Sequence, residues 1–268
     1  MAQVLAKGTA WKRSLEDYAY TRALSTAGWA WEFLRRNEAY QRDVRLNTAG
    51  IPFALKHVSG ALVFRLRRKF LAAEKWGLKA FSDPAKSAFE TTAFWLPELI
   101  TLVAFCEVRT ANDNEEQALS LTSFGGCRVV LVDATSEHLQ ISYGRRKANL
   151  SFTGGSFLIG KSQLKFYHHG LKSASCHFET LKTLSQLLAA NTGQAPALEA
   201  SDVKYRDYLI ALDGRLAGRS YRDIAEVIYG ADRVGATWTD DTQGLKSRVR
   251  RAVECGLALM NGGYLELL

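Results

Sequence analysis

The C-terminal quarter of the sequence limits the possible folds more than any other part, because glycines divide it into helix-sized segments. Gly218 and Gly230 each follow an apolar pattern of helical period, at positions where a helix commonly ends. Between them, "SYRDIAEVIYG" begins with Ser220 and has Asp223 three residues later, the pattern of a capping box. We therefore predict helices over 202–217 and 220–229. Their apolar faces comprise Tyr205, Tyr208, Leu209, Leu212 and Leu216 in the first, and Ile224, Ala225 and Ile228 in the second.

A third helix is predicted over 239–260, capped by Thr239, Asp240 or Asp241. At about 100° per residue, its apolar side collects Leu245, Val249, Ala252, Val253, Gly256 and Met260. Its outward side carries Gln243, Ser247, Arg250, Arg251 and Glu254, with Lys246 and Arg248 at the two edges. Outward cations on an apolar-backed helix are what a DNA recognition helix needs. A plain three-helix bundle with a charged surface has the same pattern and is the alternative.

The connection between Gly230 and Asp240 is longer than the turn of an ordinary helix-turn-helix motif. Trp238 is the large apolar residue in this stretch, with Val234 as its neighbour. We expect Trp238 to fold back into the three-helix core and to fix an extended turn, as a hydrophobic staple does.

The rest of the chain predicts an α+β fold. Residues 1–90 have helical patterns. A first helix is predicted to begin at a cap formed by Ser14 and Asp17 and to end at Gly28, and a further helix is predicted over 59–78. Short β-rich runs within 127–170 predict an antiparallel meander, and a helix with Leu181, Leu184, Leu187 and Leu188 on one face follows. The expected domains are a basic helical region over 1–90, a β-rich domain over 91–196 and a helix-turn-helix variant over 197–268, with 192–201 as linker.

The stretch "GSFLIGKS" matches the phosphate-binding pattern of nucleotide hydrolases, and Asp133 ends an apolar run before it. A phosphate loop must lead into a helix, whereas the residues after Lys161 alternate with the period of a strand. We interpret the stretch as a strand, a turn at Gly160 and a second strand. A nucleotide-binding protein is a remote alternative.

No other catalytic or cofactor-binding pattern is present, so we expect no enzyme and no cofactor. The four cysteines are far apart, which predicts free buried thiols, and "HHG" beside Cys176 and His177 does not have the spacing of a metal site. The most apolar segment, 94–108, is too short to span a bilayer, and no secretory signal is apparent. We expect a cytoplasmic protein with no membrane contact.

The net charge of +8 lies entirely in the first third, where residues 1–90 hold 16 Lys and Arg against 8 Asp and Glu. A basic region attracts polyanions such as nucleic acid, and a solvated charged face is the alternative. The last 67 residues hold 10 of each sign. This balance, with the rings of Trp29, Trp31, Phe33 and Tyr40, motivates a second hypothesis, a regulator that acts through protein contacts with little DNA affinity.

"WAWEFLRRNEAY", "WGLKAFSDP", "FWLPE" and the segment from "GRLAGRSYRDIAEVIYG" to the C-terminus resemble a proteobacterial family of two-part transcriptional regulators encoded on integrative and conjugative elements. The resemblance implies a regulator-like N-terminal domain and a C-terminal extended-turn helix-turn-helix domain that activates excision and transfer genes. It implies contacts to double-stranded DNA by Tyr221, Arg222, Lys246, Arg248, Arg250 and Arg251. We expect a protein partner for the N-terminal region, either the antiactivator protein that the resemblance implies or RNA polymerase.

Overall fold

The chain forms two compact units, and each is assembled from segments that are distant in sequence. The computed structural model describes residue 11 and residues 14–48, 51–112, 117–143, 146–167, 170, 174–188, 200–238 and 244–268. The helical unit comprises Met1–Arg45, Asp83–Thr91 and Pro196–Leu267, and the sheet unit comprises Leu46–Ser82, Thr92–Ala195 and Leu268. Each unit therefore contains residues from more than one of the predicted domains 1–90, 91–196 and 197–268. The predicted linker lies almost wholly outside the described residues.

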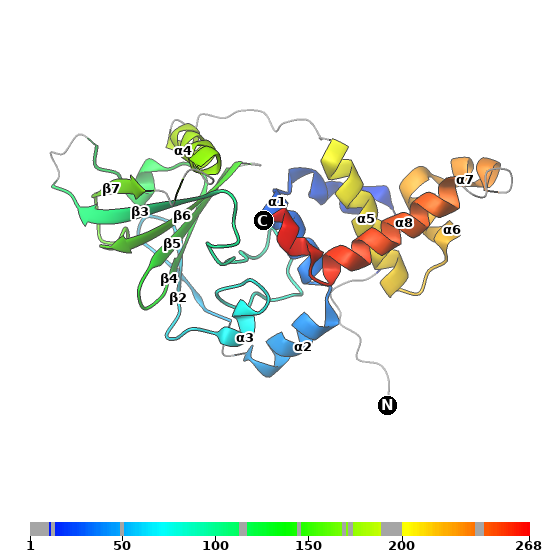
Figure 1. Cartoon of the computed structure of the whole chain (residues 1–268), viewed down its shortest axis with the longest axis horizontal. Coiled ribbons are helices and arrows are strands. Elements are labelled where there is room, and N and C mark those ends of the chain that lie inside the picture. Colours follow the sequence, from blue (N-terminus) through cyan, green and yellow to red (C-terminus); the bar gives the residue numbers. More distant parts are fainter. Residues whose placement is uncertain are drawn as a thin grey trace. The chain divides into compact units, whose positions relative to one another are not determined.

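The sheet unit contains one seven-stranded mixed sheet (Figure 1). Its strands are β1 (Ala54–Lys56), β2 (Leu62–Arg65), β3 (Val103–Thr110), β4 (Cys127–Val132), β5 (Glu137–Tyr143), β6 (Arg146–Gly154) and β7 (Ser162–Tyr167). The order is β1-β2-β4-β5-β6-β3-β7, with β2 parallel to β4 and β3 parallel to β6. Within 127–170, β4, β5 and β6 are successive antiparallel neighbours, but β7 pairs with β3 instead of β6, so the predicted meander is not confirmed over its full length.

Apolar side chains cover both faces of this sheet. Val130, Ile141 and Phe152 point to one face, where Leu184 and Leu187 of helix α4 (Ala174–Leu188) pack on them. Figure 1 shows α4 lying along that face. On the other face, Val129 and Leu131 pack with residues of the preceding segments, namely Phe64, Leu66, Phe70, Ala80 and Phe94. The alternation along β4 thus places neighbouring residues in two different cores.

The "GSFLIGKS" stretch connects β6 to β7, and no helix follows it. The side chain of Phe157 is buried, while Glu137 accepts hydrogen bonds from the Ser156 hydroxyl (2.5 Å) and the Phe157 amide (3.1 Å). The interpretation as a turn between strands is confirmed, although 156–160 is itself turn rather than strand. Asp133 binds Lys79 at 2.6 Å in the turn after β4.

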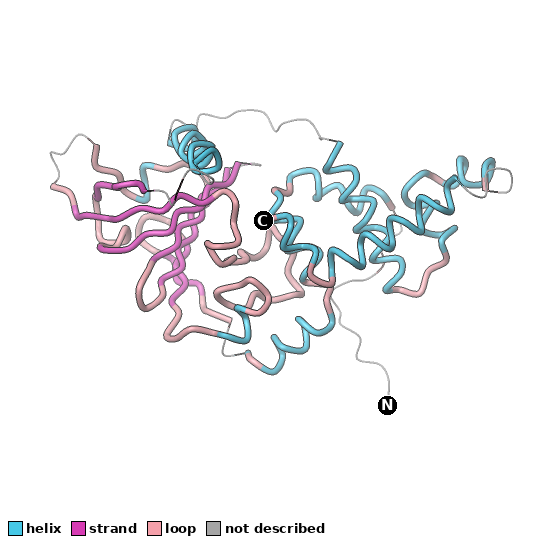
Figure 2. The backbone as a smooth tube through the Cα atoms, viewed as in Figure 1, coloured by secondary structure: helices cyan, strands magenta, loops and turns pink. Residues whose placement is uncertain are grey.

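Residues 59–78, predicted as a helix, instead form β2, a turn and the short helix α3 (Leu71–Glu74). Val63 and Phe64 belong to the cores on opposite faces of the sheet, and β2 pairs with both β1 and β4. Tertiary burial here outweighs the helical period of the segment. From α3 to β3 the chain consists mainly of turns and loops (Figure 2).

The helical unit joins elements from both ends of the chain. From the N-terminal part come the 3₁₀ helix η1 (Leu15–Ala23), α1 (Thr26–Leu34) and α2 (Glu38–Leu46). From the C-terminal part come α5 (Ala200–Leu216), α6 (Tyr221–Tyr229), α7 (Ala231–Thr237), α8 (Gly244–Met260) and η5 (Gly263–Leu267). The Ser14 capping box is confirmed, but Gly28 lies within α1 rather than ending a helix. A Cβ at Gly28 would lie 3.1 Å from the Leu24 side chain, so this glycine serves close packing.

A buried ion cluster joins α1 to α5. The Arg36 guanidinium donates to both carboxylate oxygens of Asp213, at 2.5 and 2.9 Å, and to Glu32 at 2.8 Å. All three side chains are almost fully buried, and the Tyr18 hydroxyl completes the shell of Asp213 at 3.0 Å. Burial alone would raise the pKa of Glu32, but Arg36 and Arg35 outweigh it and hold this pKa at about 2. Proximity to Asp213 likewise keeps the pKa of Arg36 above its ordinary value, despite burial.

The same cluster attaches the 83–91 loop to α1. Glu32 accepts the Ala88 amide at 2.9 Å, Arg35 donates to the Pro84 carbonyl at 3.2 Å, and the Trp31 indole donates to the Lys86 carbonyl at 3.1 Å. These bonds explain why a loop that follows β2 and α3 belongs to the helical unit.

Replacing Asp213 by Ala should strongly destabilise the full-length chain, because it leaves the Arg36 charge buried with a single acidic partner. We expect a loss of about 3–5 kcal/mol in the free energy of unfolding, measured by urea titration. Arg222→Ala, which removes the exposed pair with Glu226 at 3.2 Å, is the control and should cost less than about 1 kcal/mol. Equal losses in the two variants would contradict a structural role for the buried pair.

Acid should weaken the protein through Glu32. Its pKa in the folded state, about 2, lies below the ordinary 4.5, so the stabilisation is complete above pH 4.5 and disappears as the pH falls toward 2. The shift corresponds to about 3 kcal/mol. Unfolding free energies measured between pH 5.5 and 2.5 should fall more steeply for the parent than for Glu32→Gln. Parallel pH profiles would rule out this contribution.

Candidate nucleic-acid interface

Helix α8 presents one apolar side to the helical unit and one charged side to solvent. Its buried residues are Leu245, Val249, Ala252, Val253, Gly256 and Met260, which confirms the predicted apolar side. It packs against α5 and α6, and Figure 1 shows it running alongside α5. The burial of one side leaves the opposite side free to meet a ligand.

The register between α5 and α8 depends on a close approach at Gly256. A Cβ at this position would lie 2.6 Å from the Tyr208 carbonyl oxygen and 3.0 Å from the Leu212 Cβ. A larger residue therefore cannot occupy the position unless the two helices move apart. Gly256 thus sets how far the charged side of α8 projects.

The predicted contact residues on α8 are all exposed, namely Lys246, Arg248, Arg250 and Arg251. Arg250 is paired with Glu254 at 3.4 Å. Among the described residues, Lys246, Arg248 and Arg251 form no ion pair. The structure thus brings together three unneutralised cations on one helix.

Helix α6 carries the other two predicted contact residues at its start. Tyr221 is half-buried, and the exposed Arg222 pairs with Glu226. The Ser220–Asp223 capping box, the buried Ile224, Ala225 and Ile228, and the end of the helix at Gly230 with φ 90° are all confirmed. The Ser220 hydroxyl accepts the Asp223 amide at 3.2 Å, and Arg222 is exposed in this first turn of α6.

The connection between α6 and α8 differs from the predicted extended turn, because it contains the helix α7. Gly230 adopts a positive φ that lets the next helix begin at once, and α7 packs against α6. Val234 is fully buried, whereas Trp238 is only partly buried at the end of α7. The expectation that Trp238 folds back into the three-helix core is therefore not confirmed, and Val234 is the fully buried residue of this connection. The predicted caps Thr239, Asp240 and Asp241, together with Gln243, lie outside the described residues.

One expectation about α5 needs correction, and one buried residue of this helix was not predicted. Leu216 is 42% exposed, so it does not belong to the apolar face. Asp213, which sequence reasoning missed, is buried between the buried Leu212 and Gly214. A lone acid inside the apolar run "LIALDG" signals a buried partner of opposite charge, since an unpaired buried carboxylate is strongly disfavoured.

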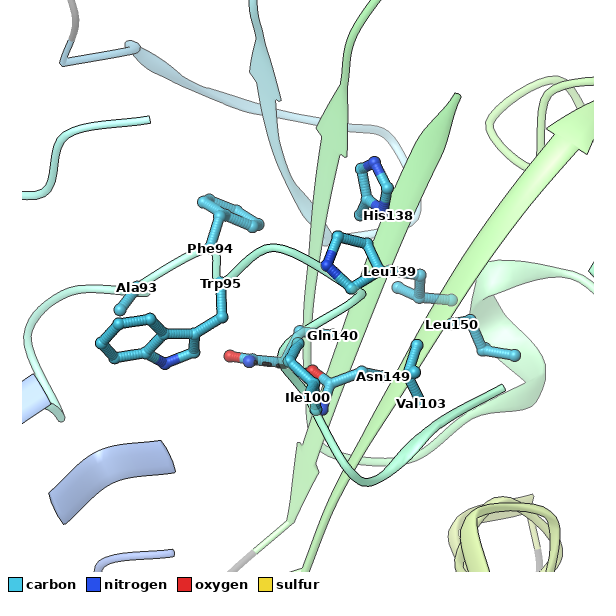
Figure 3. A pocket seen from close by; sticks show the side chains of 11 residues that line it. Ala93, Phe94, Trp95, Ile100, Val103, His138, Leu139, Gln140, Asn149 and Leu150 are labelled. Atoms are coloured by element: carbon cyan, nitrogen blue, oxygen red, sulfur yellow. Dashed lines mark hydrogen bonds between the residues drawn. The ribbon is translucent and has the colours of Figure 1, made fainter. Parts of the chain in front are cut away.

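Two cavities of the sheet unit differ in size and in lining. One, of about 20 Å³, lies beside Trp95, His138, Gln140 and Asn149, with room for roughly one water molecule. Figure 3 draws these side chains, which come from two strands and a loop, and the Gln140 amide donates to Asn149 at 3.2 Å. A second, of about 500 Å³, is an open groove along β3 and β7 whose lining mixes Glu107, Arg109 and Lys165.

The cysteines and histidines form no metal-binding group within the part of the chain that the structure describes. All four cysteines are free thiols, but only Cys106 is buried, so the prediction of buried thiols holds for that residue alone. His177 is buried on α4, and His168 and His169 lie outside the described residues. No helix among the described residues is long and apolar enough to cross a membrane.

Two family models match parts of the chain. Residues 172–268 match a family described as "T6SS, Transcription factor, DNA binding domain", and residues 11–79 match a "Proteobacterial transcriptional regulator-like domain". No curated protein matches the chain. The two matches support a DNA-binding transcription regulator with double-stranded DNA as its partner, and neither describes an enzyme.

Replacing Gly256 by Val should destabilise the helical unit without removing any charge from α8. The added side chain meets the α5 backbone, and we expect a loss of about 1–3 kcal/mol, seen as a lower midpoint in thermal unfolding. Ala258→Val, at an exposed position two residues later, is the matched control and should change stability by less than about 0.7 kcal/mol. A Gly256→Val variant as stable as its control would contradict the close approach.

Proposed function

We propose that this chain binds promoter DNA through the outward side of α8 and the start of α6. The contact residues are Tyr221, Arg222, Lys246, Arg248, Arg250 and Arg251. The observation that carries the proposal is a set of three exposed cations on α8, Lys246, Arg248 and Arg251, opposite a buried apolar side. These three form no ion pair with any residue that the structure describes. Guanidinium groups donate to phosphates and to guanine edges, so such a helix can both position and read a duplex.

The six residues contribute unequally in this proposal. Arg222 and Arg250 must exchange Glu226 and Glu254 for phosphate, so their net gain on binding is small. Arg248 and Arg251 have no such partner among the described residues and gain the full interaction. Tyr221, half-buried beside the α6 cap, supplies a ring and a hydroxyl rather than a charge.

The regulated genes and the direction of regulation come from resemblance alone. We propose an activator of excision and transfer genes on a mobile element, following the family that the N- and C-terminal motifs resemble. The description of the matched family names T6SS, which makes T6SS genes the competing target. An antiactivator protein or RNA polymerase is the proposed partner of the N-terminal region.

The second hypothesis, a regulator that works through protein contacts alone, loses one of its supports. Trp29, Trp31, Phe33 and Tyr40 are each at most 1% exposed, so their rings belong to the core of the helical unit. A partner of the N-terminal region must instead contact exposed residues. The balanced charge of the last 67 residues stays in favour of this hypothesis.

Changing Arg248 and Arg251 together to Ala should weaken binding to the DNA upstream of the chain's neighbouring genes. The slope of log affinity against log salt should fall by about 2, as expected for two lost phosphate contacts, in fluorescence anisotropy titrations. Arg42→Ala with Arg45→Ala, two exposed cations on α2, removes the same charge and is the control. Equal slopes for the parent and the α8 variant would exclude α8 from the interface.

A further inference from the structure

The turn that follows β2 carries a dense group of cations far from α8 in sequence. Between Arg65 and Lys75 the chain has five Lys and Arg residues and one acid, Glu74. All five cations are exposed. Four of them lie within five residues, and we call this set, Arg65, Arg67, Arg68 and Lys69, the basic turn.

The backbone of the basic turn is held in place by apolar side chains that point inward between the cations. Leu66 and Phe70 pack on the core that contains Val129 and Leu131. The Leu66 amide donates to the Val132 carbonyl at 2.8 Å, which extends the pairing of β2 with β4 by one residue. The cations therefore project from an ordered support, which lowers the entropy lost on binding a ligand.

No acid neutralises the basic turn among the described residues. In the pairing of β2 with β4, Arg65 lies opposite Val132, and Asp133 is the next residue after Val132. The Asp133 carboxylate is already bound by Lys79 at 2.6 Å and by the Ser136 hydroxyl at 2.9 Å. Arg68 contacts the Phe70 ring, with its guanidinium carbon 5.6 Å from the ring centre. The usual solvated surface mixes both signs of charge, and this one does not.

The charge of the whole chain also points to this region. Residues 172–268, which match a DNA-binding domain, contain 12 Lys and Arg and 12 Asp and Glu. Residues 11–79 contain 14 Lys and Arg and 6 Asp and Glu. Affinity for duplex DNA comes largely from cations that displace counterions at phosphates. Because residues 172–268 have no net charge, cations in another part of the chain can add to this electrostatic affinity for DNA.

We propose that the basic turn is a second DNA-contacting surface, which binds phosphates irrespective of base sequence. The inference rests on the proposed function, since it assumes that the chain binds DNA through α8. Arginine forks and a lysine ammonium on a fixed turn suit phosphate oxygens, and no groove-reading element accompanies them. In this arrangement α8 supplies base discrimination together with its own phosphate contacts, and the basic turn adds further salt-dependent affinity.

The test uses the full-length chain and two triple variants that remove the same charge. Arg67→Gln, Arg68→Gln, Lys69→Gln changes the basic turn, and Arg146→Gln, Lys165→Gln, Lys182→Gln changes three other exposed cations of the sheet unit. Affinities for a 60-base-pair duplex with the upstream sequence, and for a scrambled duplex, are measured at several salt concentrations. Arg67→Lys with Arg68→Lys keeps the charge, and thermal unfolding verifies that each variant is folded.

We expect the basic-turn triple to lower the salt slope by about 2–3 on both duplexes, and the control triple to lower it by less than about 1. The charge-retaining double variant should keep the parental slope. If the parent binds DNA but the two triples behave alike, the inference is overturned and the cations have another ligand, such as an acidic protein. If the parent binds neither duplex at low salt, the proposed function itself fails.

Discussion

The ion pair between Arg36 and Asp213 is the interaction on which the helical unit depends. The two residues are 177 positions apart, and both side chains are nearly inaccessible to water. A buried charge is tolerated only where opposite charges and hydrogen bonds replace water. The cluster meets this condition by balancing two guanidiniums, of Arg35 and Arg36, with the carboxylates of Glu32 and Asp213. Separating α1 from α5 would expose these charges to solvent or leave them without their ion-pair partners, so the two helices belong to one folding unit.

This constraint changes how the two family matches relate to the structure. The match at 11–79 and the match at 172–268 are separate in sequence, yet α1 of the first and α5 of the second share one ion cluster. Residues 46–79 of the first match belong to the sheet unit instead. The boundaries of the sequence families are therefore not those of the structural units. The regulator-like segment supplies part of the scaffold that supports α8.

Local sequence signals were sufficient for the features that local physics determines. The capping boxes at Ser14 and Ser220, the end of α6 at Gly230 and the buried side of α8 all follow from short-range patterns and are confirmed. The β1–β2 hairpin, the insertion of β3 between β6 and β7, and the Arg36–Asp213 pair depend on partners distant in sequence, which a single sequence does not reveal. Helix α7 was missed because "ADRVGAT" is short and polar and gains its stability from packing on α6.

One turn of α5 shows how the position of α8 is determined. Leu212 and the Tyr208 carbonyl meet α8 at Gly256, and the next residue, Asp213, binds Arg36 of the segment following α1. Gly214 then has no room for a Cβ, which would lie 2.6 Å from both Ile224 of α6 and the Trp11 ring. Three consecutive residues of α5 thus contact α8, the ion cluster and α6. Because close-packed helices resist small displacements, these contacts fix the position of α5 relative to α8. The N-terminal segment also contacts α8 directly, through α1 and through the Asn37 side-chain amide, which donates to the Met260 carbonyl at 3.1 Å, so it helps to position the candidate DNA-binding surface.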